Sequence, residues 1–290
     1  MISFSKLGSY GRLGNQLFQY AFLRSTAERL GTRFYCPTWE GDTLFDLNDT
    51  HLRADQPEGI VRTFGPPHQA GFFQGGLAIE DGSEIEGFFQ SEKFFHSRAA
   101  VKQWYSFKTE LAARALRHLP QVQFENAVSL SLRLDDDYAA TREFFPLYPL
   151  SFYRRALQMA RPYGQVVVFA DRPDRARRFL ASLGRDLIFP ENIPPHEQLY
   201  LMSRFRDNVI TNSTFAWWGA WLNANADCQV FAPSHWCRPG LPNVIDDILP
   251  ESWTKVRATT PVVDHFLTWK LLHPVSTVTR LWAKARARMA

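Results

Sequence analysis

A chain of 290 residues falls in the range, roughly 250–300 residues, where a single hydrophobic core stops growing, so its length predicts two domains. Hydrophobic residues make up 45% of the chain and charged residues 21%, which describes an ordered globular protein and excludes a disordered one. The formal net charge of +4 is compatible with an anionic ligand or a membrane surface but is too small for a nucleic-acid-binding stripe.

Signals of secretion and membrane insertion are missing from the sequence. Its 3 cysteines, an odd and sparse set, argue against a disulfide framework and against a zinc site. The first residues lack the apolar core of a signal peptide, and no window reaches the roughly 18 apolar residues of a membrane span. We therefore expect a cytoplasmic protein.

The first forty residues predict a strand, a glycine loop and a helix. Residues 2–4 form a short apolar run, and three glycines punctuate the loop over residues 8–14. Apolar residues then recur at helical spacing over residues 15–30, and Gly31 stands where a helix C-cap is expected.

The next part of the chain is less regular. Residues 37–82 are rich in Gly, Pro and Asp and show little periodicity. Residues 85–90 predict a strand, followed by a helix capped near Ser91. The segment around residues 119–121 is the best candidate for a domain boundary, which gives an amino-terminal domain over residues 1–119.

Beyond this boundary strands and helices alternate. The predicted strands are residues 127–132, 166–170, 187–189, 208–210 and 229–232. The predicted helices are residues 149–159, with proline at the first position, 173–183, 196–205 and 215–223. This alternation predicts the α/β class, with a doubly wound parallel sheet and right-handed crossovers, in a second domain over residues 120–260.

The tail, residues 261–290, predicts a basic amphipathic helix. No acidic residue follows Asp264, and Pro274 is placed to open the helix. Its basic residues are Lys270, Arg280, Lys284, Arg286 and Arg288. Two roles are open: packing back against the protein, or peripheral contact of residues 265–290 with an anionic inner membrane.

A polar elbow precedes the last predicted helix, at residues 212–221 (NSTFAWWGAW). Asn212, Ser213 and Thr214 follow a strand, where short polar side chains can cap a helix and leave backbone N–H groups free for a phosphate. The alternative is a capped helix with an aromatic core face. The glycine loop at residues 8–16 presents the same choice between close approach to a ligand and a plain connection.

Two charged residues stand at the ends of other predicted strands. Arg133 could grip a diphosphate through two hydrogen bonds, or pair with one of the aspartates at residues 135–137. Those three aspartates also suggest a divalent metal, although a separated pair would be a stronger signal. Asp171 could contact a ribose or base, or cap the helix that begins at Pro173.

Taken together, several blocks resemble one enzyme family. The blocks are residues 11–21 (GRLGNQLFQYA), 86–95 (EGFFQSEKFF), 199–203 (LYLMS), 212–222 (NSTFAWWGAWL) and 232–236 (APSHW). Their order resembles that of the glycosyltransferase family 11 fucosyltransferases over roughly residues 8–238, and the block that begins at Asn212 is very specific.

The resemblance implies a GT-B enzyme in which two Rossmann-like doubly wound domains face a cleft, with residues 1–119 as the acceptor-side domain and residues 120–260 as the GDP-sugar-binding domain. It implies transfer of L-fucose from GDP-fucose to a galactose hydroxyl, with inversion and usually in α-1,2 linkage, in bacterial surface polysaccharide or lipopolysaccharide synthesis. The implied partners are a nucleotide sugar and a glycan acceptor, without nucleic acid, and no metal or cofactor is required.

The resemblance also implies the site residues. Arg133 would stabilise the charge that develops on the β-phosphate, and Asp136 would act as general base or orient Arg133. The residues expected at the donor are Gly11, Gly14, Asn15, Gln16, Arg133, Asp171, Asn212, Ser213, Thr214 and Trp217.

One motif departs from the family pattern. The family reads His-x-Arg-Arg-x-Asp where this chain has Ser131, Arg133, Leu134 and Asp136. The missing second guanidinium removes a charge-assisted hydrogen bond of roughly 1.5–3 kcal/mol to the diphosphate. Two alternatives therefore stay open: another GDP-sugar as donor, or a non-catalytic carbohydrate-binding homologue.

Overall fold

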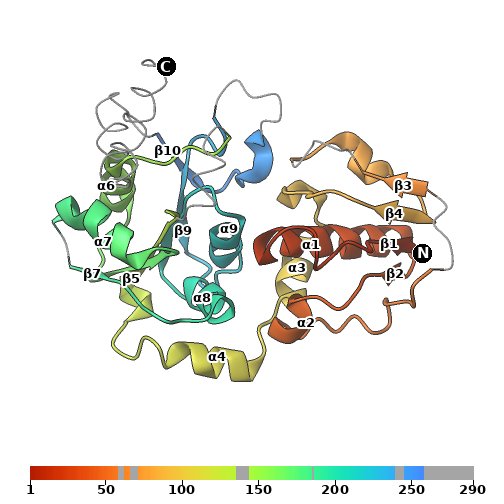
Figure 1. Ribbon diagram of the computed structural model, residues 1–290, viewed down its shortest axis with the longest axis horizontal. Coiled ribbons are helices and arrows are strands. Elements are labelled where there is room, and N and C mark those ends of the chain that lie inside the picture. Colours follow the sequence, from red (N-terminus) through yellow and green to blue (C-terminus); the bar gives the residue numbers. More distant parts are fainter. Residues whose placement is uncertain (58–61, 66–70, 135–143, 185, 239–244, 258–290) are drawn as a thin grey trace, which may run out of the picture.

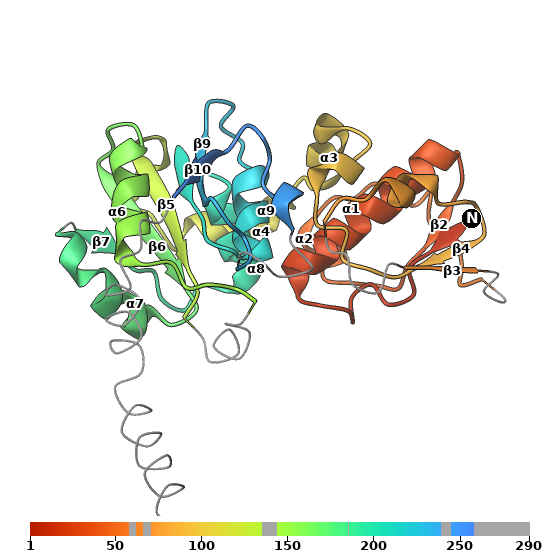
Figure 2. The same ribbon diagram turned by 90° about the horizontal axis from the view of Figure 1, so that it is seen from above.

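The computed structural model describes residues 1–57, 62–65, 71–134, 144–184, 186–238 and 245–257. Over these residues the chain forms two α/β halves that lie side by side along the long axis of the molecule (Figure 1, Figure 2). Each half is built on its own parallel sheet, which confirms the predicted fold class.

The amino-terminal half contains a four-stranded sheet in the order β2-β1-β4-β3. Its strands are β1 (Ile2–Ser3), β2 (Phe34–Tyr35), β3 (Arg62–Phe64) and β4 (Ser83–Ile85). The helices of this part of the chain are α1 (Leu13–Leu30), α2 (Gly41–Leu44), α3 (Arg98–Trp104) and α4 (Thr109–Leu116), with 3-10 turns η1 (Gln74–Ala78) and η2 (Glu92–Phe94). As predicted, α1 ends at Gly31, whose φ of 63° places it in the left-handed region.

The carboxy-terminal half contains a six-stranded sheet in the order β10-β9-β8-β5-β6-β7. Its strands are β5 (Ala127–Leu132), β6 (Gln165–Ala170), β7 (Leu187–Ile188), β8 (Asp207–Val209), β9 (Gln229–Pro233) and β10 (Thr254–Val256). Its helices are α6 (Leu150–Met159), α7 (Pro173–Leu180), α8 (Pro195–Met202) and α9 (Thr214–Trp221), with 3-10 turns η3 (Phe124–Asn126), η4 (Ala181–Leu183) and η5 (Asp246–Ile248).

Helices cover both faces of this second sheet. Side chains of α6 and α7 pack with one set of strand residues, which includes Val128 and Val168. Side chains of α8 and α9 pack with the alternate set, which includes Val167 and Phe169. Because both faces are buried, β6 is apolar along nearly its whole length, as doubly covered parallel strands usually are. The neighbouring strands β5 and β8 also bury polar side chains, such as Ser129 and Asn208, which hydrogen-bond to each other.

Three sequence predictions differ from the structure in detail. The strand predicted at residues 85–90 ends at Ile85, because Gly87 (φ 155°) and Phe89 (φ 50°) leave the extended conformation. This turn points Phe89 into the core, where its side chain is fully buried. Pro149 occupies the N-cap of α6 rather than its first turn. Third, Ser91 caps only the 3-10 turn η2, and the next α-helix, α3, is capped by Ser97. The sequence analysis did not predict strands β2, β3 and β10 or helices α2 and α4.

The connection between the halves runs through α3 and α4. Helix α4 packs against α8, so the chain already contacts the carboxy-terminal half before the predicted boundary near Leu119. That boundary stays a prediction. The predicted tail helix, residues 261–290, and Asp136 lie outside the described residues.

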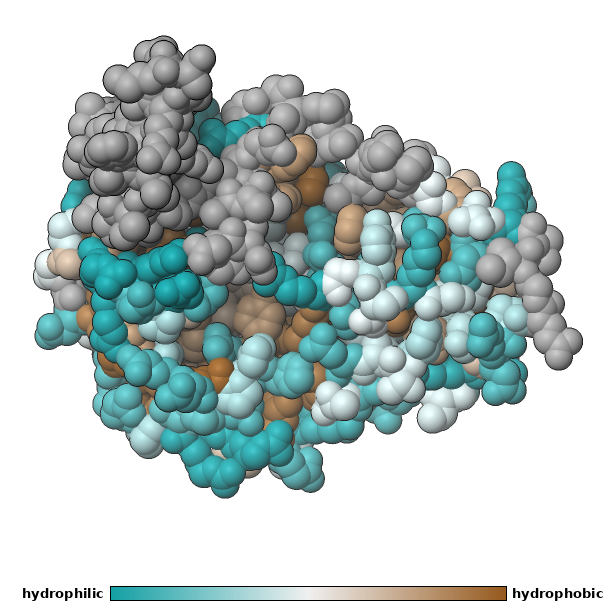
Figure 3. Space-filling view, viewed as in Figure 1, coloured by the Kyte–Doolittle hydropathy of each residue, from teal (hydrophilic) through white to brown (hydrophobic). Residues whose placement is uncertain are grey.

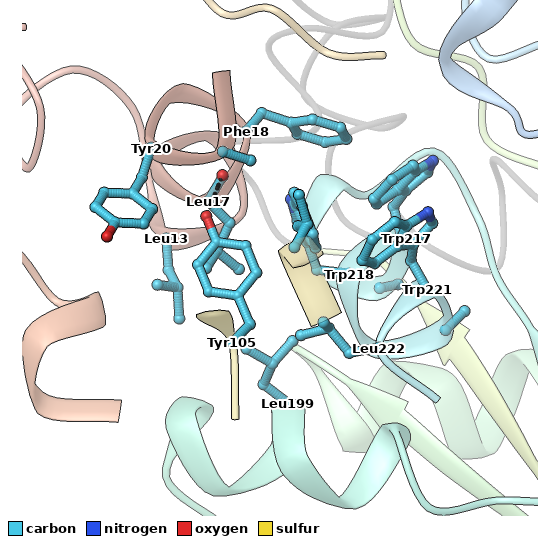
Figure 4. Packing of buried hydrophobic residues seen from close by; sticks show 14 of the residues in the cluster. Leu13, Leu17, Phe18, Tyr20, Tyr105, Leu199, Trp217, Trp218, Trp221 and Leu222 are labelled. Carbon is cyan, nitrogen blue, oxygen red and sulfur yellow. Dashed lines mark hydrogen bonds between the residues drawn. The ribbon is translucent and has the colours of Figure 1, made fainter. Parts of the chain in front are cut away.

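One hydrophobic core is shared by the two halves. Phe18 of α1 packs against Trp217 and Trp218 of α9, with ring centroids 4.5 and 4.9 Å apart (Figure 4). Tyr105 follows α3 and donates a hydrogen bond of 2.6 Å to the carbonyl of Leu17 in α1. The same cluster continues into α8. Burial of these side chains therefore stabilises both halves and their contact together.

Candidate active site

A pocket of about 790 Å³ lies where the two halves meet, at the carboxyl ends of β5 and β6. The carboxy-terminal half lines it with residues 131–133, 169–171 and 213–216, and the amino-terminal half with residues 12–14 and Glu40. In the space-filling view, apolar side chains show near the middle of the molecule between hydrophilic ones (Figure 3). Parallel α/β sheets bind ligands at this edge, which makes the pocket the candidate active site.

Three of the specific sequence blocks meet at Asn15, beside this pocket. Its side-chain oxygen accepts hydrogen bonds from the hydroxyl of Thr214 at 3.0 Å and from Gln90 Nε2 at 2.9 Å. Next to it, the indole of Trp218 donates to the carbonyl of Gly14 at 3.0 Å. Blocks that lie about 200 residues apart in sequence therefore form one contact, and the geometry explains why they occur together.

Gly14 brings the start of α1 against the start of α9. A Cβ atom at this position would lie 2.5 Å from the backbone nitrogen of Phe215 and 2.6 Å from the hydroxyl of Thr214, closer than real Cβ atoms approach. The glycine is therefore needed for packing, independently of any ligand.

The start of α9 offers a site for an anion. Its N-cap Ser213 accepts a hydrogen bond from Ala216 N–H, and no acceptor for the N–H groups of Thr214 and Phe215 is found among the described residues. Neither α1 nor α9 has an acidic residue in its first turn. The N-termini of α1 and α9, which carry the positive ends of the helix dipoles, therefore meet at the pocket. Because no carboxylate of their first turns neutralises them, they favour the binding of a phosphate.

Arg133 and Asp171 stand on the carboxy-terminal wall of the pocket, one strand apart. Arg133 Nε lies 3.7 Å from Asp171 Oδ2, and Asp171 Oδ1 accepts a hydrogen bond of 2.7 Å from Leu134 N–H. Helix α7 begins at Pro173 with Arg172 at its N-cap, so Asp171 joins two strand ends and is not the helix cap. Its second oxygen orients Arg133 toward the pocket that both residues line.

Other residues expected at the donor lie inside the protein. Trp217 is fully buried and donates to the carbonyl of Ile248 at 2.7 Å. Asn212 is 5% exposed and donates to the carbonyls of Pro146 and Trp236 at 3.2 and 3.1 Å. In this structure these two side chains hold the elbow in shape and do not line the pocket.

The same holds for part of the glycine loop. Gln16 is 2% exposed, and its Nε2 donates to the carbonyls of Gly8 and Gly11 at 3.2 and 3.0 Å. Gly11 adopts a φ of 89° and lies against Asn15. Of the predicted donor set, the residues that line the pocket are Gly14, Arg133, Asp171, Ser213 and Thr214.

The sequence analysis missed two parts of the pocket wall. Glu40 belongs to an aperiodic segment in which no spacing marks a functional residue. Residues 190–192 follow β7, and Asn192 adopts a φ of 58°. A non-glycine residue with positive φ often lies at a functional site, but this conformation is not visible in sequence.

Among the residues that the structure describes, no three His, Cys, Asp or Glu side chains gather so that they could hold a metal ion. The acidic run at residues 135–137 lies outside them, so metal independence stays a prediction. None of the described helices is both long and apolar enough to cross a bilayer.

Comparison with known proteins gives a consistent family. The sequence profile named Glycosyl transferase family 11 matches residues 5–255. An alpha-1,2-colitosyltransferase of Escherichia coli is 26% identical over 284 residues, which cover 85% of this chain and 96% of the relative. The O-antigen biosynthesis glycosyltransferase WbnK of Escherichia coli is 26% identical over 172 residues, which cover 55% of this chain and 57% of the relative.

The solved structure of a mutant of Arabidopsis thaliana FUT1 in complex with GDP is similar in fold, with a TM-score of 0.50. It is 10% identical and the match covers 80% of this chain and 70% of that one, so the likeness concerns the fold alone. The two parallel α/β halves with the pocket between them form a GT-B fold. The chain belongs to glycosyltransferase family 11.

Proposed function

We propose that the protein is an inverting glycosyltransferase that transfers L-fucose from GDP-fucose to a galactose hydroxyl of a bacterial surface glycan, in α-1,2 linkage. The observation that carries the proposal is that Arg133 and the start of α9 line the same pocket. A guanidinium, a helix N-terminus and two hydroxyl-bearing residues, Ser213 and Thr214, converge on one pocket at the carboxyl ends of parallel strands.

In this proposal the diphosphate lies against Arg133 and the first turn of α9. As the bond between the anomeric carbon and the phosphate breaks, negative charge builds on the β-phosphate of GDP. Arg133 and the N–H groups of Thr214 and Phe215 stabilise that charge in the transition state. Asp171 supports Arg133 from the neighbouring strand end.

Leu134 takes the place of the family's second arginine, and the structure gives it another role. Its side chain is buried in the core beneath α6 and α7, and its N–H is held by Asp171. Arg133 therefore carries a larger share of phosphate recognition in this proposal than one arginine of a pair would carry.

A transfer assay tests the proposal. GDP-fucose is incubated with a panel of β-galactoside oligosaccharides, and a product one deoxyhexose heavier is sought by mass spectrometry, with linkage determined by NMR. We expect an α-1,2-fucosylated product. Binding of GDP-fucose without transfer to any acceptor would instead support the non-catalytic alternative.

A second candidate donor is GDP-colitose, because the relative that this chain matches over 96% of its length is named an alpha-1,2-colitosyltransferase. Colitose is L-fucose without its 3-hydroxyl. A site that hydrogen-bonds this hydroxyl rejects the analogue by roughly 10⁴–10⁵-fold, whereas an apolar subsite discriminates only weakly. The ratio of kcat/KM for the two donors, measured alongside other GDP-sugars, decides between them.

Two remaining parts of the proposal concern metal and membrane. We propose a metal-independent reaction, so activity should survive a chelator; restoration of lost activity by magnesium or manganese would contradict this. We also propose that residues 265–290 attach the cytoplasmic enzyme peripherally to anionic membranes, with roughly 1 kcal/mol from each basic residue near the surface. Co-sedimentation with anionic and neutral vesicles, with and without the tail, tests the attachment.

A further inference from the structure

One carboxylate of the pocket differs from the others in both position and partners. The acidic residues that line the pocket are Glu40, Asp171, Asp174 and Glu191. The last three belong to the carboxy-terminal half, and each is paired with an arginine. Glu40 comes from the amino-terminal half and has no Lys or Arg within 4.0 Å among the described residues.

Building on the proposed function, we propose that Glu40 is the general base that removes the proton from the acceptor hydroxyl, and that His196 is a positioning residue that holds it. An inverting transfer requires the acceptor oxygen to attack in line, on the side of the anomeric carbon away from the leaving diphosphate. The diphosphate-binding groups, Arg133 and the start of α9, belong to the carboxy-terminal half. A base on the opposing, amino-terminal wall matches this geometry.

The carboxylate of Glu40 is available for this role because its hydrogen bonds to other described residues leave one oxygen with only a long contact. Glu40 occupies the N-cap position of α2, yet its side chain makes no capping hydrogen bond. His196 Nε2, at the first turn of α8, lies 3.0 Å from Glu40 Oε2. Oε1 lies 3.5 Å from Gln16 Nε2. This contact is long for a hydrogen bond, so Oε1 can still accept a hydrogen bond from the hydroxyl of the glycan acceptor.

The backbone that carries Glu40 is fixed. Trp39 is 4% exposed and stacks on Tyr20 with ring centroids 5.0 Å apart. Its N–H donates to Asp42 Oδ2 at 2.9 Å. A Cβ atom at Gly41 would come within 2.3 Å of the Trp39 ring, so the chain follows that ring closely. A catalytic group on such a restrained segment keeps its geometry between turnovers.

In the proposed step, proton transfer accompanies attack by the acceptor oxygen. The acceptor hydroxyl gives its proton to Glu40 Oε1 while its oxygen forms the new bond to the anomeric carbon. The bond from that carbon to the phosphate oxygen breaks, and its electron pair goes to the β-phosphate of the departing GDP. Glu40 then releases the proton to solvent, which its half-exposed side chain can reach.

Glu40→Gln tests the proposal, because glutamine keeps the shape of the side chain but cannot take a proton. We expect kcat for transfer to fall by at least about 100-fold, with the affinity for GDP and the donor KM within threefold of wild type. Azide, a nucleophile that carries no proton, should be glycosylated by the variant about as fast as by wild type. Glu40→Asp should retain part of the activity, and His196→Gln should lower kcat less than Glu40→Gln does, without changing donor KM.

Glu80→Gln is the matched control, because Glu80 is an exposed carboxylate of the same half, paired with Arg62. Transfer by Glu40→Gln within threefold of wild type would overturn the role of Glu40 and leave the proposed function intact. Loss of the azide reaction together with GDP binding would show a structural role and would also overturn it. Failure of the wild-type enzyme to transfer from any GDP-sugar would overturn the proposed function, and the role of Glu40 with it.

Discussion

The two halves of the molecule build their walls of the pocket in different ways. In the carboxy-terminal half, long strands end at the pocket, and β5 pairs with β6 in register over six residues, Ala127–Leu132. In the amino-terminal half the strands have only two or three residues, and Glu40 stands on a loop. Tertiary contacts replace the missing ladder: Asp49 accepts hydrogen bonds from Tyr20 at 2.6 Å and from Arg53 at 2.7 Å.

This comparison shows that the amino-terminal wall of the pocket depends on the carboxy-terminal half for its stability. The amino-terminal half is completed by the core that it shares with α8 and α9, whereas the carboxy-terminal half has an additional cluster of its own beneath α6 and α7. Damage to the shared core should therefore affect both halves, and damage to the separate cluster mainly one.

Trp218→Ala should give the largest loss of stability, about 3–5 kcal/mol, because it opens a cavity in the shared core and removes the hydrogen bond to Gly14. Urea unfolding measures the loss, and hydrogen exchange locates it; we expect faster exchange in α1 as well as α9. Phe152→Ala, in the separate cluster, is the control and should leave α1 protected. Unchanged exchange in α1 of the Trp218 variant would show that the halves are independent.

Arg133→Ala should lower turnover by at least about 100-fold, as expected when one group that stabilises transition-state charge is removed. Because Leu134 offers no second guanidinium, no neighbouring arginine of the motif can substitute for it. Steady-state kinetics of the folded variant provide the measurement. Arg133→Lys should recover only part of the rate, since an ammonium cannot form two parallel hydrogen bonds. Near-normal turnover of Arg133→Ala would show that the diphosphate does not bind at Arg133.

Gly14→Ala tests the contact between the walls directly. Alanine favours a helix over glycine by about 1 kcal/mol, yet here its Cβ would meet backbone atoms of α9, so we expect a net loss of about 1–3 kcal/mol and weaker GDP binding. Thermal unfolding and GDP titration report the two effects. Gly75→Ala is the matched control, because a Cβ there would meet only the Phe73 ring at 3.6 Å. A Gly14→Ala variant as stable as wild type would contradict the prediction, because it would show that α1 and α9 can move apart without loss of stability.

Glu197→Gln should give the smallest effect, at the α4–α8 contact. Burial would raise the pKa of Glu197, but hydrogen bonds from Arg114 at 3.1 Å and His118 at 2.6 Å outweigh it and hold the pKa below its usual range. A carboxyl with a lowered folded-state pKa stabilises the fold above about pH 4.3 and loses this contribution as the pH falls through its folded-state value.

Unfolding of the wild type should therefore become easier as the pH falls from about 5 to 3, and less so in Glu197→Gln. Urea midpoints across this range provide the measurement. Glu110→Gln, on the exposed side of α4, is the control and should keep the wild-type dependence. An identical dependence in Glu197→Gln would assign the acid sensitivity to other carboxyls.

The difference between the halves also explains what the sequence could predict. Residues 166–170 were predicted to within one residue of β6, because a buried parallel strand carries its own continuous apolar signal. The strand predicted at residues 85–90 failed because an apolar run does not reveal that Phe89 adopts positive φ. Local periodicity describes regular elements, whereas the irregular half is shaped by contacts between distant residues.

The site follows the same rule. Strand ends and helix starts are marked in sequence, and Arg133 and Thr214 do line the pocket. A motif does not distinguish residues that face a ligand from residues that hold the motif in shape, so buried Trp217 was grouped with them. Glu40 carries no local signal, because only the tertiary fold brings its loop to the pocket.

The contact of Gly14 with α9 has a consequence for building chimeric enzymes. Exchanging acceptor-side segments between family members is an obvious way to seek new glycan specificities, and a cut between the two sheets would be the natural junction. Here that cut separates Gly14 from the Thr214 and Phe215 backbone against which it packs, and Asn15 from the Thr214 hydroxyl to which it is hydrogen-bonded. A functional hybrid should therefore carry residues 11–21 and 212–222 from the same parent, even though they belong to opposite halves.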